Sequence, residues 1–162
     1  MSEALFNIDL LGDKKLQKQL NKLMAKDQKK AVNQGLKKAT AMVRTVTRQQ
    51  VKSSGSGTGA SAKAIKSYKI KAKGRRGFVG WRVASGTRED IVKHGGDPKI
   101  LYKKTTGKSG KKQGYYPAHM EYGYSGRSGT GAMERAFKMS YPRAITVLRQ
   151  EMRNFVRKVM KR

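Results

Sequence analysis

Cysteine is absent from this chain of 162 residues, so disulfide bonds and thiolate-based zinc sites are excluded. Histidine is scarce, and the two residues of this type are His94 and His119. No catalytic or metal-binding motif surrounds either of them, and paired carboxylates for general acid–base catalysis are lacking. The sequence therefore predicts a protein that is not an enzyme and that carries no metal or other cofactor.

Long apolar runs are lacking as well. None approaches the roughly 20 residues that a membrane-spanning helix needs. The segment from Met1 to Leu11 carries Glu3 and Asp9, and it does not have the basic and then apolar regions of a secretory signal. We therefore expect the protein to remain in the cytoplasm in which it is made, without a membrane partner.

Acidic residues are few: the chain has 10 Asp and Glu against 38 Lys and Arg, which gives a formal net charge of +28. No acidic residue occurs from Gln28 to Arg88. A monomer with this charge repels itself and attracts polyanions, so its partners could be nucleic acid, an anionic membrane surface or acidic faces of other proteins. Hydrophobic residues make up only 36%, which indicates a modest core with extended segments that become ordered against a partner.

Three short patterns match known motifs but lack their context. Gly107-Lys108-Ser109 matches the end of a phosphate-binding loop, but Tyr102 stands where that loop needs its first glycine. Gly57-Thr58-Gly59 fits part of a dinucleotide-binding fingerprint, yet it follows a predicted helix rather than a strand. His119-Met120-Glu121 fits the start of a zinc-deaminase motif, whose later cysteine ligands are missing here. We interpret the first two patterns as loops and His119 as a packing residue.

The N-terminal part of the chain has the apolar spacing of a helix. Asp13 could cap its start, and a break near Ala25 to Gln28 leaves two possibilities for residues 13–52, one long helix or two helices. The apolar positions recur at steps of three and four within two stretches, and they are Leu16, Leu20, Leu23, Val32, Leu36, Ala39, Val43 and Val46.

Alternating apolar residues predict a β-hairpin over residues 64–84, with a turn at Gly74 to Gly77. Residues 85–114 are polar and basic and predict an arm or loop, or a second hairpin, because so long a segment is unusual in a small domain. Pro117 to Gly123 predicts a short helix or an edge strand. A second helical pattern predicts a C-terminal helix over 141–160, with Ser140 as its cap and Pro142 in its first turn.

Together these elements predict a single α+β domain over residues 1–162. It has a long N-terminal helix, a small antiparallel sheet built on the β-hairpin, and a C-terminal helix packed on the sheet. We expect the core to join these three elements. The residues predicted to be buried are Val43, Val46, Trp81, Val83, Leu148 and Phe155.

Three sets of residues are candidates for contacts. Glu121 is a lone acid in a basic stretch, so we expect an Arg or Lys partner in the same or a neighbouring subunit. The apolar patch Ile100-Leu101-Tyr102 needs cover, so we expect the arm to dock on another component of an assembly. The basic residues predicted to contact a polyanion or an acidic partner are Lys66, Lys69, Lys71, Lys73, Arg75, Arg76, Lys103, Lys104, Lys108, Lys111 and Lys112.

The order of these elements and their local signatures resemble the phage head–tail joining proteins typified by the tenth gene product of phage HK97. In that pattern a threonine–glycine pair and then an isoleucine follow the first helix, as Thr58-Gly59 and Ile65 do here. Met120-Glu121-Tyr122-Gly123 matches the next signature, although Tyr124 replaces its final threonine. Met133, Ala136 and Phe137 match the entry to the last helix, where both family prolines are missing.

This resemblance implies a structural virion protein that forms a homo-oligomeric ring in the neck and acts in tail completion. Its partners would be copies of itself and neighbouring connector and tail proteins, with possible non-specific contact to DNA. It would be found in the virion, and in the host cytoplasm during assembly. The alternative is a basic nucleic-acid-binding protein of the ribosomal or nucleoid type, which the net charge of +28 favours directly.

Overall fold

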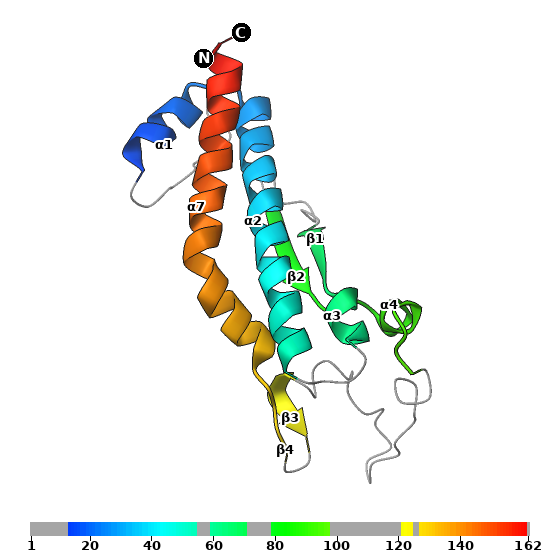
Figure 1. Cartoon of the computed structure of the whole chain (residues 1–162). Coiled ribbons are helices and arrows are strands. Elements are labelled where there is room, and N and C mark those ends of the chain that lie inside the picture. The colour runs from blue at the N-terminus through cyan, green and yellow to red at the C-terminus, as the bar shows by residue number, and fades with distance from the viewer. Residues whose placement is uncertain (1–12, 55–58, 71–78, 98–120, 125–126, 162) are drawn as a thin grey trace, which may run out of the picture. The chain divides into compact units, whose positions relative to one another are not determined.

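The structure is a computed structural model, and it describes residues 13–54, 59–70, 79–97, 121–124 and 127–161. The helices are α1 (Lys14–Asn21), α2 (Ala25–Ser53), α3 (Ala60–Ala64), α4 (Arg88–Lys93) and α7 (Ala132–Met160). The strands are β1 (Lys66–Ile70), β2 (Gly80–Ala84), β3 (Gly123–Tyr124) and β4 (Arg127–Ser128). Figure 1 shows these elements in chain order. The predicted α+β class, with a long N-terminal helix and a C-terminal helix, is confirmed.

The strands form two small sheets, one of β1 and β2 and one of β3 and β4. β3 and β4 are antiparallel, with Gly123 opposite Ser128 and Tyr124 opposite Arg127. The predicted turn at Gly74 to Gly77 lies outside the described residues. So does most of the segment predicted as a short helix, whose last residue, Gly123, begins β3.

The chain divides into two compact units. Unit 1 comprises Met1–Met42, Ser67–Arg82 and Pro142–Arg162, and unit 2 comprises Val43–Lys66 and Val83–Tyr141. α2 and α7 each contribute one part to each unit.

The N-terminal helical segment consists of two helices. Asp13 caps α1, and its Oδ1 accepts a hydrogen bond from the Leu16 amide at 3.0 Å. The chain leaves the helix after Asn21 and begins α2 at Ala25. The Gln28 side chain stabilises the turn, since its Nε2 donates to the Leu23 carbonyl at 2.9 Å.

The core of unit 1 joins α1 to the first half of α2 and the second half of α7. Its buried residues are Leu16, Leu20, Ala31, Met152 and Val156, with Leu23, Val32, Leu148 and Phe155 packed around them. A Cβ at Gly35 would lie 2.7 Å from the Leu148 Cδ1 atom and 3.1 Å from the Leu148 carbonyl oxygen. α2 and α7 therefore approach closely here, and a larger residue at this position would require Leu148 to move.

The sheet of β1 and β2 is attached to α2 within unit 1. The Trp81 indole N–H donates to Asn33 Oδ1 at 3.0 Å, and the Ser67 hydroxyl donates to the Thr40 carbonyl at 3.3 Å. The Arg82 guanidinium lies 5.7 Å from the centre of the Tyr68 ring. Arg82 of β2 thus makes a cation–π contact with Tyr68 of β1.

Unit 2 has two small cores built largely from alanine. One contains Val51, Ala62, Ile65 and Ala132, with Val83 and Met133 against it. The other contains Ala60, Ala64 and Ile91, with Val92 against it.

The predicted list of buried residues is wrong in detail. Val43, Val46, Trp81, Val83, Leu148 and Phe155 are all only partly buried. The buried positions along α2 and α7 are often alanine, namely Ala31, Ala39, Ala132, Ala136 and Ala144. Small residues therefore occupy several of the buried positions on these two helices, and the larger side chains that we predicted to be buried are only partly so.

The C-terminal helix starts at Ala132, well before the predicted residue 141. Pro142 therefore lies inside the helix, and the hydroxyl of Ser140 does not cap it but donates to the Ala136 carbonyl at 2.7 Å. A proline inside a helix costs about 3 kcal/mol because it removes one backbone hydrogen bond. The helix nevertheless continues through Pro142, and Ala136, Ser140 and Ala144 on either side of it are buried.

Candidate functional site

The first part of α7, in unit 2, exposes aromatic side chains and buries small ones. Phe137 is 53% exposed and Tyr141 is 52% exposed, and their ring centres lie 5.4 Å apart. Tyr141 is one helical turn after Phe137, so the two side chains follow one line along the helix. We call Phe137 and Tyr141 the aromatic row. On the same segment Ala132, Ala136 and Ser140 are buried.

Phe137 and Tyr141 are apolar residues four positions apart on one face of this helix, yet unit 2 leaves both about half exposed. Packing through the alanine positions turns the buried face of this segment away from the aromatic row. Tyr122, which precedes β3, is 85% exposed as well. Exposed aromatic side chains are typical of surfaces that bind other proteins.

Glu121 holds the start of α7. Its Oε2 accepts a hydrogen bond from the Met133 amide at 2.9 Å, and its Oε1 accepts one from the Glu134 amide at 2.9 Å. The Glu121 carbonyl also accepts from the Gly131 amide at 3.1 Å. Because the first amides of a helix have no partner within it and carry partial positive charge, this carboxylate caps α7 from a distant point in the chain.

The partners of Glu121 differ from those that we predicted. An Arg or Lys side chain was expected, but the bonds that the structure shows come from backbone amides. The positive end of a helix can satisfy a carboxylate as a cation would. The structural role expected for Glu121 therefore has a different physical basis.

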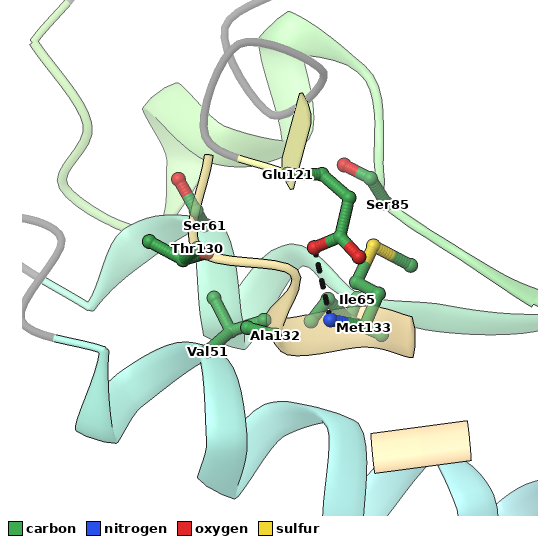
Figure 2. Close-up of a pocket in the computed structure, with 8 residues that line it drawn as sticks. All are labelled: Val51, Ser61, Ile65, Ser85, Glu121, Thr130, Ala132 and Met133. Atoms are coloured by element: carbon green, nitrogen blue, oxygen red, sulfur yellow. Dashed lines mark hydrogen bonds between the residues drawn. The ribbon is translucent and has the colours of Figure 1, made fainter. Parts of the chain in front are cut away.

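A cavity of about 20 Å³ lies beside this cap in unit 2. Such a volume holds about one water molecule. Figure 2 shows the Glu121 side chain entering it and bonding to the start of α7. It is lined by Val51, Ser61, Ile65, Ser85, Glu121, Thr130, Ala132 and Met133. The site can therefore stabilise the loop that enters α7.

Lys66 is the one predicted basic contact with a described structural role. Its ammonium forms an ion pair with Asp90, which is also part of the capping box of α4 with Thr87. The hydrogen bond from Lys66, followed by the one from the Thr87 amide, lowers the pKa of Asp90. Lys66 therefore joins β1 to α4 through this ion pair, so contact with a polyanion is not its sole role.

Lys69 is exposed on β1, so it remains open to a partner. The other predicted contacts lie outside the described residues. They are Lys71, Lys73, Arg75, Arg76, Ile100, Leu101, Tyr102, Lys103, Lys104, Lys108, Lys111 and Lys112.

Arg48 has a structural role that sequence reasoning missed. Its guanidinium donates to the Ile65 carbonyl at 2.7 Å and 3.1 Å and to the Lys63 carbonyl at 2.9 Å. It thereby satisfies the carbonyls where α3 ends. Burial, with a smaller effect of Arg44, lowers the pKa of Arg48. No spacing in the sequence marks this residue.

The helix α4 was also missed, and here a signal exists. Residues 85–114 were predicted as a basic arm, and their first part contains α4 (Arg88–Lys93). The Thr87 hydroxyl accepts from the Asp90 amide at 3.2 Å, and the Asp90 carboxylate accepts from the Thr87 amide at 3.1 Å. The spacing from Thr87 to Asp90 is that of a capping box, with Asp in place of Glu.

Comparison of the chain with protein-family models, curated proteins and solved structures gives no match. Within the described ranges, no cluster of His, Cys, Asp or Glu is placed to hold a metal ion. In the same ranges, no helix is both long enough and apolar enough to cross a membrane.

Proposed function

We propose that this chain is a structural protein of a tailed bacteriophage, which forms a homo-oligomeric ring in the neck and joins head to tail. The proposal starts from the order of sequence signatures that resembles the head–tail joining family. The physical roles of several signature residues support it, and the exposed aromatic row carries it.

Three signature residues have roles in unit 2. Gly59 directly precedes α3 with a φ of 72°, which favours glycine over other residues. Ile65 is 2% exposed and directly precedes β1. Glu121 caps α7 through two amides. If the chain has the fold of the head–tail joining family, residues with these roles are expected at these positions. Their roles therefore support the resemblance but do not test it.

The aromatic row is the observation that favours an assembly function. Burial of one large apolar or aromatic side chain contributes about 1.5–3 kcal/mol. Phe137 and Tyr141 are about half exposed, so a partner would gain part of that stabilisation by covering them. A ring requires a contact of this kind between each copy and the next.

The direct test is the mass of the purified protein, measured by light scattering after size exclusion and by electron microscopy. We expect rings for the unaltered chain and loss of rings for the double variant Phe137→Ser/Tyr141→Ser. The matched control is Met24→Ser/Met160→Ser in unit 1, whose side chains are 81% and 54% exposed. Rings that survive the first variant, or that are lost equally in both, would rule out the aromatic row as the contact.

The phage role has a separate test. A phage that lacks this gene should accumulate unjoined heads and tails, and the unaltered gene supplied in trans should restore complete particles. The Phe137→Ser/Tyr141→Ser gene should not restore them. Normal particles from the deleted phage would contradict the proposal.

The second candidate is a nucleic-acid-binding protein, which the net charge of +28 favours. The two functions respond to salt in opposite ways. Nucleic-acid binding weakens steeply as salt rises. Self-association of a strongly basic chain through apolar side chains strengthens, because salt screens the repulsion between copies.

A further inference from the structure

The helix α1 presents lysine on the face opposite its buried leucines. Leu16 and Leu20 are 1% and 0% exposed and belong to the core of unit 1. Lys14, Lys18 and Lys22 follow one another at steps of four residues, with Lys22 at the C-cap. All three side chains are exposed. With Lys15, which is also exposed, they form what we call the lysine face.

The spacing of this face suits a row of phosphates. Steps of four residues in an α-helix place successive charges about 6 Å apart along the axis. A duplex carries one phosphate per about 3.4 Å of each strand, so lysine side chains of this spacing can each reach a separate phosphate.

The helix α1 is held in place by contacts within unit 1. Asp13 caps the helix, and its other carboxylate oxygen accepts a hydrogen bond from Arg153 of α7. The Leu16 amide is the largest cause of the lowered pKa of Asp13, and Arg153 lowers it further. The lysine face is therefore carried on an ordered backbone.

The acidic residues of this region are already engaged. Asp13 pairs with Arg153, and Asp27 lies 3.5 Å from Lys30. Among the described residues, no carboxylate lies within ion-pair distance of the lysine face. The first half of α2 adds more exposed positive charge, from Lys26, Lys29, Lys30, Lys37 and Lys38.

The composition distinguishes a nucleic acid from an acidic protein. Residues 13–42 contain nine lysines but no arginine and no aromatic residue. Surfaces that bind proteins are depleted in lysine and enriched in arginine and aromatic side chains. Lysine, as a compact and strongly hydrated point charge, suits phosphate contacts that do not read sequence.

We infer that the lysine face of α1 binds the phosphate backbone of a nucleic-acid duplex, without preference for base sequence. This inference does not rest on the proposed function. A neck ring around a passing duplex and a free nucleic-acid-binding protein could both use the face, and the assembly state tells them apart.

The test compares two triple variants that lose the same charge. Lys14→Gln/Lys18→Gln/Lys22→Gln removes most of the lysine face. Lys52→Gln/Lys63→Gln/Lys93→Gln removes three exposed lysines of unit 2. Binding to a labelled mixed-sequence DNA duplex is measured by fluorescence anisotropy over a range of salt concentrations. Circular dichroism checks that both variants remain folded.

The face variant should lower the slope of log K against log salt by about 2–3, because each phosphate contact contributes about 0.9. Its affinity should fall on the order of 100-fold at about 0.1 M salt, whereas the control should lose much less. An equal loss in both variants would show that only net charge matters and would overturn the inference. So would displacement of the duplex by poly-L-glutamate at equal charge, which would point to an acidic protein partner.

Discussion

The core of unit 1 contains leucine, methionine and valine side chains, whereas the cores of unit 2 consist mainly of alanine, and unit 2 exposes Phe137 and Tyr141. Both units also contain polar bonds, which in unit 1 join Arg153 to Asp13 and Trp81 to Asn33. Unit 2 is stabilised by the Glu121 cap, by Arg48 on the end of α3 and by the ion pair between Lys66 and Asp90. Small side chains bury little area, so polar bonds have more to contribute there. The comparison also separates the two exposed surfaces, one suited to a polyanion and one suited to a protein.

The largest effect is expected in the core of unit 1. Leu20→Ala removes a side chain with 0% exposure and should lower the free energy of unfolding by about 2–5 kcal/mol. Urea denaturation followed by circular dichroism measures it. A loss well below 1 kcal/mol would mean that unit 1 does not depend on this packing, and it would contradict the contrast between the cores of the two units.

Arg48 should rank next. Arg48→Met leaves the Ile65 and Lys63 carbonyls without this donor, which should cost about 1–3 kcal/mol in the same measurement. The matched control is Arg44→Met, one turn earlier in α2, where the buried Nε atom has no hydrogen-bond partner. The control should not lower stability, because it removes a buried nitrogen that makes no hydrogen bond. Equal losses would show that Arg48 acts only through packing.

Glu121 should have a smaller effect. Glu121→Ala removes the acceptors for two amides at the start of α7 and should cost about 0.5–2 kcal/mol. Glu121→Gln keeps one acceptor oxygen and should lose less. Glu134→Gln, which affects only an exposed pair with Lys138, serves as the control. If Glu121→Ala leaves both unfolding and ring formation unchanged, the cap has no role.

Acid should produce the smallest effect. Hydrogen bonds from Lys66 and Thr87 lower the pKa of Asp90 in the folded state, so its stabilising contribution is present above the unfolded pKa of an aspartate. That contribution should be lost as the pH falls through the lower folded value, below about 4. Asp90→Asn should reduce the loss of stability between about pH 5 and pH 3. An unchanged pH profile for this variant would contradict the role of Asp90.

The sequence predicted the parts of the fold that depend on repeated apolar spacing. Leu16 and Leu20 indicated the N-terminal helices, and alternating residues indicated the strands that contain Tyr68 and Trp81. The buried alanines, such as Ala31, Ala132 and Ala136, were missed because alanine has a weak hydrophobic signal. Pro142 was predicted to lie at a helix start because proline is unfavourable inside a helix. The burial of residues on either side of it was not part of that prediction.

The bonds that stabilise unit 2 were harder to predict. The amides bound by Glu121 follow it by 12 and 13 residues, and Arg48 reaches carbonyls 15 and 17 residues away. No local pattern links such residues, because only the fold brings them together. The cap between Thr87 and Asp90 was local and could have been found.

The exposure of the aromatic row could not be predicted either. Periodicity shows that Phe137 and Tyr141 lie on one side of a helix but does not show whether the chain itself covers that side. In unit 2 both side chains are about half exposed, and this exposure indicates a surface for a partner rather than a face of the core.

The central claim is that copies of this chain associate through the aromatic row against the repulsion of a net charge of +28. The most direct measurement is sedimentation velocity of the nucleic-acid-free protein as NaCl rises from about 0.1 M to about 1 M, over which the screening length falls from about 10 Å to about 3 Å. The account predicts that the oligomeric fraction increases with salt and that Phe137→Ser/Tyr141→Ser abolishes it at every concentration. An oligomer that dissociates as salt rises, or a chain that stays monomeric throughout, would contradict the account.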